Sequence, residues 1–318
     1  MRKVTRRTWL GCAGTAALTL SVPQILAGET SKLRTAAKKN IKLAIFTGVY
    51  SGLPVAQAAE RIRDEGFSGV VLEYNFADVR FDPWAPNWSA VEKITEAFGR
   101  YNLAIVGLFG YYNVVDPDET RRRRGEQRMQ LLINNWRLFK CRVVCTETGT
   151  LNAQSEWLES PDNATEVAYV QCRENFEKLA HLAEKAGAVV AIEPYWRNVI
   201  DSAPRAQRLF RDIGSPALKL VMDPCNYFRK EDLPSQNTML RDIFARLGKY
   251  VVLAHAKDVR PSADGTDLPA AGMGVLNYPL YLRLLVGLKK EVYLAVEHLT
   301  LNDVKRVRDY VQQQIDSL

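Results

Sequence analysis

Eight short apolar runs alternate with amphipathic helical segments between residue 41 and the end of this 318-residue chain. Runs that are almost wholly apolar are typical of parallel strands buried on both faces. Because a helical segment follows each run, the pattern indicates repeated strand–helix units, and eight units favour a closed barrel over an open sheet. We therefore predict an α/β fold, a single-domain (β/α)8 TIM barrel over residues 41–318. The runs occupy residues 41–46, 69–74, 103–109, 143–147, 188–193, 218–223, 250–255 and 292–297.

Capping signals place several helices between these runs. Ser89 is the expected N-cap of the helix after the second run. Residues 116–119 (DPDE) give an N-cap at Asp116 for a helix that continues to about residue 140. Gly187 ends a long helix over residues 162–186. No Gly-rich GxGxxG turn follows the first run, so the sequence does not favour a dinucleotide-binding fold.

Four residues of metal-ligating type each close one of the last four runs, and they lie 30, 32 and 42 residues apart. In a closed parallel barrel all strands end at the same mouth, so these side chains are expected to converge. A carboxylate at the end of a buried strand must be solvated, paired or metal-bound to avoid a large desolvation cost. Two Glu, one Asp and one His suit one divalent ion: Mn²⁺, Mg²⁺, Co²⁺ or Zn²⁺. The predicted metal ligands are Glu193, Asp223, His255 and Glu297.

The sequence around these ligands resembles that of the xylose-isomerase-like sugar isomerase and epimerase superfamily. The order Glu, Asp, His, Glu on the fifth to eighth strands is similar, and so are the flanking segments. Each motif is short, but their order and spacing together are fairly specific, and the resemblance extends from about residue 41 to the end. The similar segments are 192–194 (IEP), 222–226 (MDPCN), 255–259 (HAKDV), 272–274 (GMG) and 277–279 (NYP).

The resemblance implies that a divalent ion binds a sugar carbonyl and an adjacent hydroxyl, acidifies the neighbouring C–H bond and stabilises an enediolate. Glu193 and Glu297 would act as acid–base groups as well as ligands. Lys257 either assists as an electrostatic or acid–base group or forms a salt bridge with Asp258 at the rim. We expect a metal-dependent sugar isomerase or epimerase. The alternatives are a lyase or dehydratase acting on a keto-sugar, inosose or keto-glycoside, and a barrel that binds sugar without catalysis.

Further residues near the strand ends are candidates for contact with a carbohydrate substrate. Asn226 stands where ketose epimerases of the superfamily carry a substrate-binding His, so ketose specificity stays open. The two glutamates that end the second and fourth runs either bind substrate or pair with an arginine. The aromatic pair after Glu193 forms a wall for a sugar face or packs at the rim. The candidate substrate-binding residues are Glu73, Glu147, Tyr195, Trp196, Asn226 and His298, and Trp84 and Trp88 are expected to cap the mouth.

Charge and histidine content argue against a nucleic-acid partner. Residues 1–27 hold four basic residues and no acidic one, so without them 39 basic residues stand against 36 acidic ones, a net charge of +3. That balance favours neither nucleic acid nor an anionic membrane. Endonucleases of the superfamily use a His-rich trinuclear zinc centre, which a chain with three His cannot build. We expect a small-molecule carbohydrate as partner, and a homo-oligomer stays open.

The N-terminus has the pattern of an export signal. A basic start precedes an apolar stretch over residues 9–22 and a small-residue cleavage site at 25–27. Residues 5–10 (TRRTWL) resemble a twin-arginine signal with Trp in place of the usual Phe. We predict a signal peptide over 1–27, a polar linker over 28–40, no stable membrane span after cleavage, and a periplasmic enzyme that acts on non-phosphorylated sugars. Four cysteines (Cys141, Cys145, Cys172 and Cys225) are expected as buried apolar residues, and a disulfide stays open.

Overall fold

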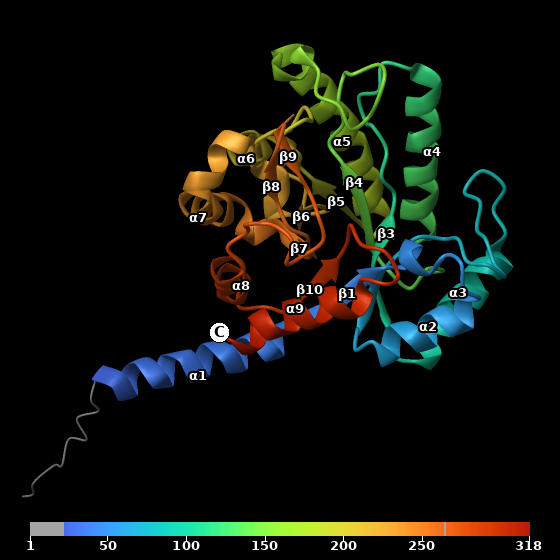
Figure 1. Cartoon of the computed structure of the whole chain (residues 1–318). Helices are drawn as coiled ribbons and strands as arrows, with labels where there is room; N and C mark the ends of the chain where they lie inside the picture. Colours follow the sequence, from blue (N-terminus) through green and yellow to red (C-terminus); the bar gives the residue numbers. More distant parts are fainter. Residues whose placement is uncertain (1–21, 264) are drawn as a thin grey trace, which may run out of the picture.

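Eight parallel strands form the barrel that the sequence predicts (Figure 1). The computed structural model describes residues 22–263 and 265–318. The strands close in the order β1-β10-β7-β6-β5-β4-β3-β2, so the prediction of a single-domain TIM barrel is confirmed. The barrel strands are β1 (Ile41–Phe46), β2 (Gly69–Leu72), β3 (Ala104–Phe109), β4 (Val143–Glu147), β5 (Val189–Glu193), β6 (Leu218–Met222), β7 (Val251–Ala256) and β10 (Val292–Val296).

The strand register closes the barrel without a free edge. Ala44 of β1 pairs with Gly69 of β2 on one side and with Ala295 of β10 on the other. Side chains that point inward fill the barrel, which is why the strands tolerate so few polar residues. This inner core lies beneath the carboxyl ends of the strands. It consists of Ala44, Phe46, Val71, Cys145, Ala191, Val221, Leu253 and Ala295.

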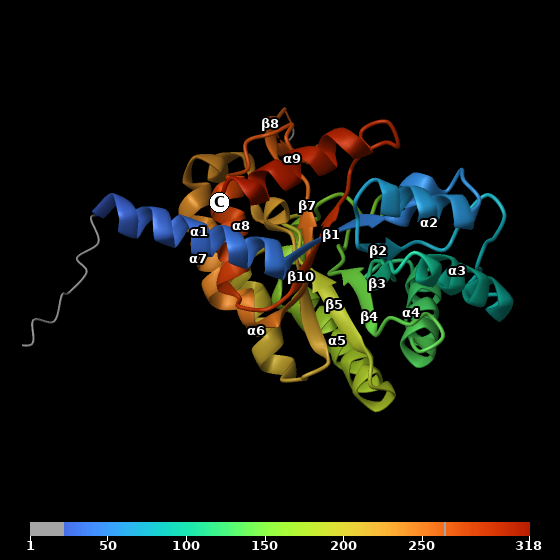
Figure 2. The ribbon, with the colours of Figure 1, turned by 90° about the horizontal axis from the view of Figure 1, so that it is seen from below.

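Helices surround the strands, and Figure 2 shows them from below. A larger apolar core fills the space between helices and strands. The stripe of Val304, Val307, Val311 and Ile315 on the last helix is buried, as its spacing predicts. The helices are α1 (Val22–Asn40), α2 (Val55–Asp64), α3 (Trp88–Arg100), α4 (Glu119–Asn135), α5 (Glu166–Ala186), α6 (Ala203–Ile213), α7 (Gln236–Leu247), α8 (Tyr278–Gly287) and α9 (Val304–Asp316), with short 3-10 turns at Thr47–Tyr50, Pro161–Ala164, Pro224–Tyr227, Lys230–Ser235 and Gly248–Tyr250.

Two predicted helix starts are each wrong by two residues. The N-cap of α3 is Asn87, and Ser89 lies within the helix, where its hydroxyl donates to Asn87 Oδ1 at 2.7 Å. The N-cap of α4 is Asp118, whose carboxylate accepts from the backbone N–H groups of Thr120 and Arg121. The Asp116 carboxylate lies before the helix start, where it accepts from the backbone N–H of Asp118 at 2.8 Å and pairs with the Arg121 guanidinium at 2.8 and 2.9 Å.

The segment expected as a polar linker, residues 28–40, is helical and belongs to α1. Ala37 is fully buried, and Leu33 and Ala36 pack against the core near α8 and α9. Lys38 forms an ion pair of 2.9 Å with Asp316 of α9. The first part of the predicted signal peptide, residues 1–21, lies outside the described residues. From residue 22 on, no helix in the described part of the chain is long and apolar enough to cross a membrane.

A short hairpin that the sequence analysis missed lies between β7 and α8. It consists of the antiparallel strands β8 (Arg260–Ser262) and β9 (Gly265–Asp267). Thr266 in β9 is buried, donates to the carbonyl of Phe228 at 3.2 Å and accepts from Trp196 Nε1 at 3.3 Å. The four cysteines between residues 141 and 225 are buried and free, as apolar packing residues would be.

Candidate metal centre and substrate cavity

The four predicted metal ligands lie together at the carboxyl end of the barrel. Glu193 is the last residue of β5, Asp223 and Glu297 directly follow β6 and β10, and His255 lies in β7. One ligand atom from each residue lies within 4.8 Å of those from the other three. Parallel strands in register bring these side chains together, because each ends its strand at the same level.

His255 lies at the centre of this cluster. Its Nδ1 is 3.3 Å from Glu193 Oε1, 3.4 Å from Glu297 Oε1 and 3.7 Å from Asp223 Oδ2. The imidazole is buried, and within the described residues neither ring nitrogen has a hydrogen-bond partner. Buried polar atoms are rarely left without a partner, and the one ammonium nearby, that of Lys257, balances only part of the charge of three carboxylates this close. The donor set and its orphaned nitrogens therefore fit a divalent metal ion, with one His and three carboxylates as ligands.

Lys257 reaches into the same cluster. Its ammonium lies 2.8 Å from Asp223 Oδ2 and 2.9 Å from Glu297 Oε1, and its side chain is buried. Burial alone lowers the pKa of Lys257, but the charges of Asp223 and Glu297 outweigh it and raise that pKa well above its usual value. The alternative of a rim salt bridge with Asp258 is wrong, because the Asp258 carboxylate accepts from the backbone N–H groups of Val259, Gly272 and Leu276 instead.

The two predicted acid–base carboxyls are both held in the ionised form. Burial raises the pKa of Glu297, but the positive charges of Lys257 and His255 outweigh it and hold that pKa well below its usual range. The pKa of Glu193 is also lowered, since His255 outweighs the effect of burial. A carboxylate can accept a proton, so both groups have the charge state that a general base needs.

Neighbouring side chains fix the orientation of the ligands. The Asn226 amide donates to Glu193 Oε1 at 2.7 Å, and the hydroxyl of Tyr111 donates to Glu193 Oε2. Tyr281 donates to the carbonyl of His255 at 2.9 Å. Such second contacts hold ligands in place before a metal or substrate binds. The sequence analysis missed Tyr111, whose position two residues after β3 is the one signal that the chain offers for it.

A cavity of about 520 Å³ lies over the ligand cluster. Of the six candidate substrate-binding residues, five line it. The aromatic and apolar residues in its wall suit the faces of a sugar ring, and the carboxyls suit its hydroxyls. The lining residues are Phe46, Val49, Glu73, Phe109, Tyr111, Glu147, Trp157, Glu193, Tyr195, Asn226, Lys257, Leu268, Glu297, His298 and Leu299.

Trp196 is the sixth candidate, and it does not line the cavity. Its ring is buried and contacts the guanidinium groups of Arg197 and Arg229, each 4.6 Å from the ring centre. Its Nε1 donates to Thr266 of the β8–β9 hairpin. In this structure the ring has the alternative position, packed at the rim, and the substrate-binding role of Trp196 stays a prediction. The hairpin, which the sequence did not indicate, covers this side of the indole.

The predicted mouth residues Trp84 and Trp88 also lie outside the cavity. Trp88 begins α3 and packs against Phe81 and Phe139. Trp84 is 42% exposed and lines two smaller hollows beside the cavity. The cavity wall instead has Trp157, from the loop between β4 and α5, which the sequence analysis missed.

Glu147 is a buried carboxyl that faces the cavity with no partner. Within the described residues, neither of its oxygens accepts or donates a hydrogen bond, and no arginine pairs with it. Burial, with smaller effects from the charges of Glu156 and Glu193, raises the pKa of Glu147 well above its usual value. Burial also raises the pKa of Glu73. A neutral carboxyl can both donate to and accept from a hydroxyl group, so Glu147 suits a polyol ligand.

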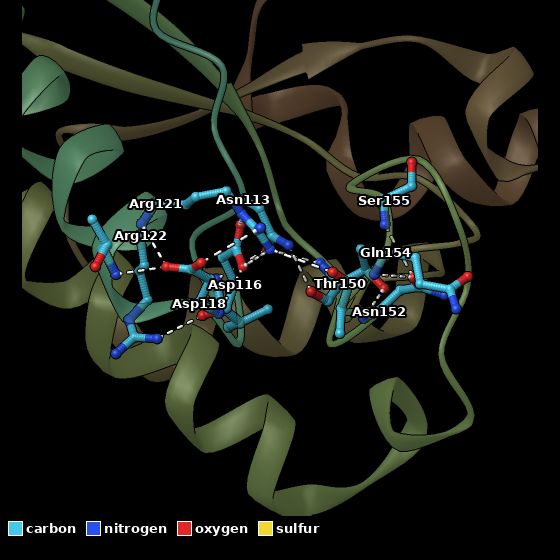
Figure 3. A network of polar contacts seen from close by, with 12 residues as sticks. Asn113, Asp116, Asp118, Arg121, Arg122, Thr150, Asn152, Gln154 and Ser155 are labelled. Carbon is cyan, nitrogen blue, oxygen red and sulfur yellow. Dashed lines mark hydrogen bonds and ion pairs between the residues drawn. The ribbon is translucent and has the colours of Figure 1, made fainter.

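Two loops that form this side of the cavity are tied together by side chains (Figure 3). Asn113, in the loop between β3 and α4, donates to the carbonyl of Thr150 at 2.7 Å and accepts from the N–H of Thr150 at 3.0 Å. On the far side of Thr150, the carboxamide of Asn152 accepts from the N–H groups of Gln154 and Ser155. These bonds link the loop that carries Tyr111 to the loop that carries Trp157.

Comparisons with known proteins support the same fold. The model of the family described as "Xylose isomerase-like TIM barrel" matches residues 59–314. A xylose isomerase-like TIM barrel protein from Mycobacterium smegmatis, solved in complex with magnesium, is 18% identical, with a TM-score of 0.65, over 88% of this chain and 98% of that one. The 3-keto-D-glucoside 4-epimerase YcjR from E. coli is 15% identical, with a TM-score of 0.61, over 86% and 98%.

A third similar structure is the probable 3-DHS dehydratase AsbF from Bacillus anthracis. It is 14% identical, with a TM-score of 0.64, over 85% of this chain and 97% of that one. No curated protein sequence matches the chain. At these identities the solved structures establish the fold alone.

Proposed function

Because the chain belongs to the xylose isomerase-like TIM barrel family, we propose that it is a divalent-metal-dependent enzyme that moves a proton next to a sugar carbonyl, as an isomerase or epimerase. The observation that carries this proposal is the buried Glu193–Asp223–His255–Glu297 cluster beneath a sugar-sized cavity. A metal ion bound there would polarise a carbonyl and make the adjacent C–H bond more acidic.

The chain's own carboxylates supply the proton transfer. Glu193 and Glu297 are ionised and face the cavity, so one can take a proton from a bound sugar. The Tyr111 hydroxyl and the Asn226 amide hold the Glu193 carboxylate in one orientation at the cavity wall. Return of the proton to the opposite face of the same carbon gives an epimer, and return to the neighbouring carbon gives an isomer.

The remaining wall residues bind and orient the sugar. Tyr195 and Trp157 offer aromatic faces, and Glu147 offers a neutral carboxyl to a hydroxyl group. Lys257 stays protonated and holds Asp223 and Glu297 by charge, and its ammonium can stabilise negative charge that develops on a sugar oxygen. Aromatic side chains also reduce the access of water to the reacting carbon.

A second candidate is elimination from a keto-sugar, inosose or keto-glycoside. Lys257 favours it, because a buried ammonium beside Glu297, one of the two acid–base carboxylates, can donate a proton to a leaving oxygen. Two structures with this fold represent the two reaction types: one is a 3-keto-D-glucoside 4-epimerase and the other a probable 3-DHS dehydratase. Export through the predicted signal peptide belongs to the proposal as well, and it favours non-phosphorylated sugars.

Solvent deuterium tests both candidates. We expect the metal-loaded protein to exchange a C–H proton of its sugar for deuterium without loss of water or aglycone. Release of water or an aglycone would favour elimination instead. Glu297→Gln should abolish exchange, and full activity of that variant with metal still bound would contradict the two-carboxylate mechanism. Absence of bound metal after loading with Mn²⁺ or Zn²⁺ would contradict both candidates.

A further inference from the structure

Two hollows lie directly beside the main cavity and share walls with it. One, of about 350 Å³, shares Glu73 and Phe109 with the cavity. The other, of about 320 Å³, shares Phe109, Tyr111 and Trp157. Trp84, Arg124 and Arg128 line both hollows, and we call these three residues the outer subsite. A charged group that projects from a sugar ring in the cavity past these shared walls would lie at the outer subsite.

Arg128 is a half-buried cation whose charge has no carboxylate partner. Its Nη2 donates to the carbonyl of Tyr111, and its Nε is buried without a hydrogen bond. Among residues 22–263 and 265–318 no carboxylate lies within ion-pair distance of it. A guanidinium taken out of water without a counter-ion is costly, so this arrangement suits a site whose anion arrives with the ligand.

Arg124 lies one helical turn before Arg128 on α4, so both side chains are on the same face. Its guanidinium stacks on Trp84 at 4.0 Å from the ring centre, and Trp84 Nε1 donates to the Arg124 carbonyl at 3.4 Å. In the described chain Arg124 also forms no ion pair. The guanidinium is therefore held at the edge of the hollows by an aromatic ring and leaves its N–H groups for a ligand.

The other arginines of this run are occupied. Arg121 pairs with Asp116, Arg123 pairs with Glu119, and Arg122 donates to the Asp116 carbonyl at 2.5 Å. Arg121 also lines the second hollow, but its guanidinium is paired with Asp116, whereas Arg124 lines both hollows and forms no ion pair in the described chain. The sequence RRRR alone does not distinguish these four arginines, so their different contacts follow from the fold.

We propose that the substrate carries an oxyanion, which binds to Arg124 and Arg128 while its carbonyl end occupies the main cavity. The export proposed above favours a carboxylate, and a phosphate ligand would count against that export. The proposal deepens the proposed function and rests on it, because the reacting end is assigned to the metal centre. Two guanidinium groups recognise a planar or tetrahedral oxyanion through paired N–H donors. Glu73, Asp82 and Glu156 also line the hollows, and they oppose binding of an anion that does not reach both arginines.

Calorimetric titration of the Mn²⁺-loaded protein with D-glucose, D-glucuronate and D-glucose 6-phosphate tests the subsite. Arg124→Ala should weaken binding of at least one anionic probe by about tenfold, as expected for a lost charge-assisted hydrogen bond. The matched control is Arg123→Ala, which removes an equal charge from the same helix at a position that faces away. Arg128→Lys keeps the charge but loses the fork, and its melting temperature reports whether it folds.

An oxyanion can also bind the metal ion directly, so binding of an anionic probe alone does not prove the outer subsite. The comparison of Arg124→Ala with Arg123→Ala therefore carries the test. Loss of glucuronate binding alone would identify a carboxylate, and loss of glucose 6-phosphate binding alone would identify a phosphate. Equal losses in both variants, or no binding of either anionic probe, would overturn the proposal. Failure of the proposed function would look different: anion binding sensitive to Arg124→Ala would persist, but no sugar would exchange deuterium.

Discussion

The ammonium of Lys257 lies 2.8 Å from Oδ2 of Asp223, one of the four residues that fit a metal ion. The lysine is two residues after His255 on β7, so its side chain emerges on the same side of the sheet. Its charge balances part of the negative charge of the cluster. A site with three carboxylates, one imidazole and one ammonium keeps a net charge near zero once a divalent ion is bound.

Replacement of Lys257 by Met should separate metal binding from catalysis. Without the ammonium the carboxylates are freer to bind a cation, so metal content should stay at about one ion per chain. Proton transfer should slow by about 10²–10⁴-fold, the usual effect of losing a charged acid–base group. Metal analysis and deuterium exchange on the same preparation measure the two effects. Loss of the metal with full retention of activity in Lys257→Met would contradict this expectation.

Replacement of His255 by Ala should remove the metal. The imidazole is central to the cluster, and both of its nitrogens lack partners in the described chain. His181→Ala on α5 is the control, because that residue lies far from the cluster in the fold and should leave metal content unchanged. Chelation should lower the melting temperature of the parent protein, since a ligand at 100 times its Kd stabilises by about 2.7 kcal/mol. An unchanged melting temperature in both parent and variant would contradict a metal centre here.

The sequence was sufficient to predict the barrel and the convergence of the ligand cluster, because both follow from a regular repeat of strand and helix. Each of Glu193, Asp223, His255 and Glu297 ends an apolar run, and parallel strands bring their ends to one mouth whatever the loops do. Their roles in the reaction remain predictions. Trp196 could not be placed from sequence, because its environment depends on the hairpin at residues 260–267, whose short strands have no apolar pattern.

Loop contacts were beyond sequence reasoning for the same reason. Tyr111 and Trp157 enter the cavity from loops, where no period of two or 3.6 residues fixes the direction of a side chain. The sequence offers two acids, Asp116 and Asp118, as caps of α4, and only the folded loop decides that Asp118 accepts from the first turn while Asp116 accepts from the N–H of Asp118 and pairs with Arg121. The helix over residues 28–40 depends on α8 and α9 to bury Ala37, and these helices are more than 200 residues away along the chain.

Replacement of Asn113 by Ala should loosen the cavity wall. Its buried carboxamide bonds both backbone groups of Thr150, and their loss leaves a donor and an acceptor unpaired, at about 1–3 kcal/mol each. We expect a lower melting temperature and a higher KM for the sugar, because the loops of Tyr111 and Trp157 lose their connection. Asn134→Ala, an exposed change on α4, is the control. A normal KM with a normal melting temperature would show that the loops are held by other contacts.

Alkaline pH should destabilise the protein through its buried thiols. Burial raises the pKa of the Cys141 thiol to about 12, whereas an unfolded thiol ionises near pH 8.5. Between these values the folded state holds the proton that the unfolded state has lost, so the free energy of unfolding falls as pH rises. Between pH 7.5 and pH 9.5, the free energy of unfolding of Cys141→Ala should therefore fall by about 1 kcal/mol less than that of the parent, as measured by urea titrations at each pH. In the folded protein at pH 8, iodoacetamide should leave Cys141 unlabelled. Rapid labelling of Cys141, together with the same pH dependence of unfolding in parent and variant, would contradict a buried, protonated thiol.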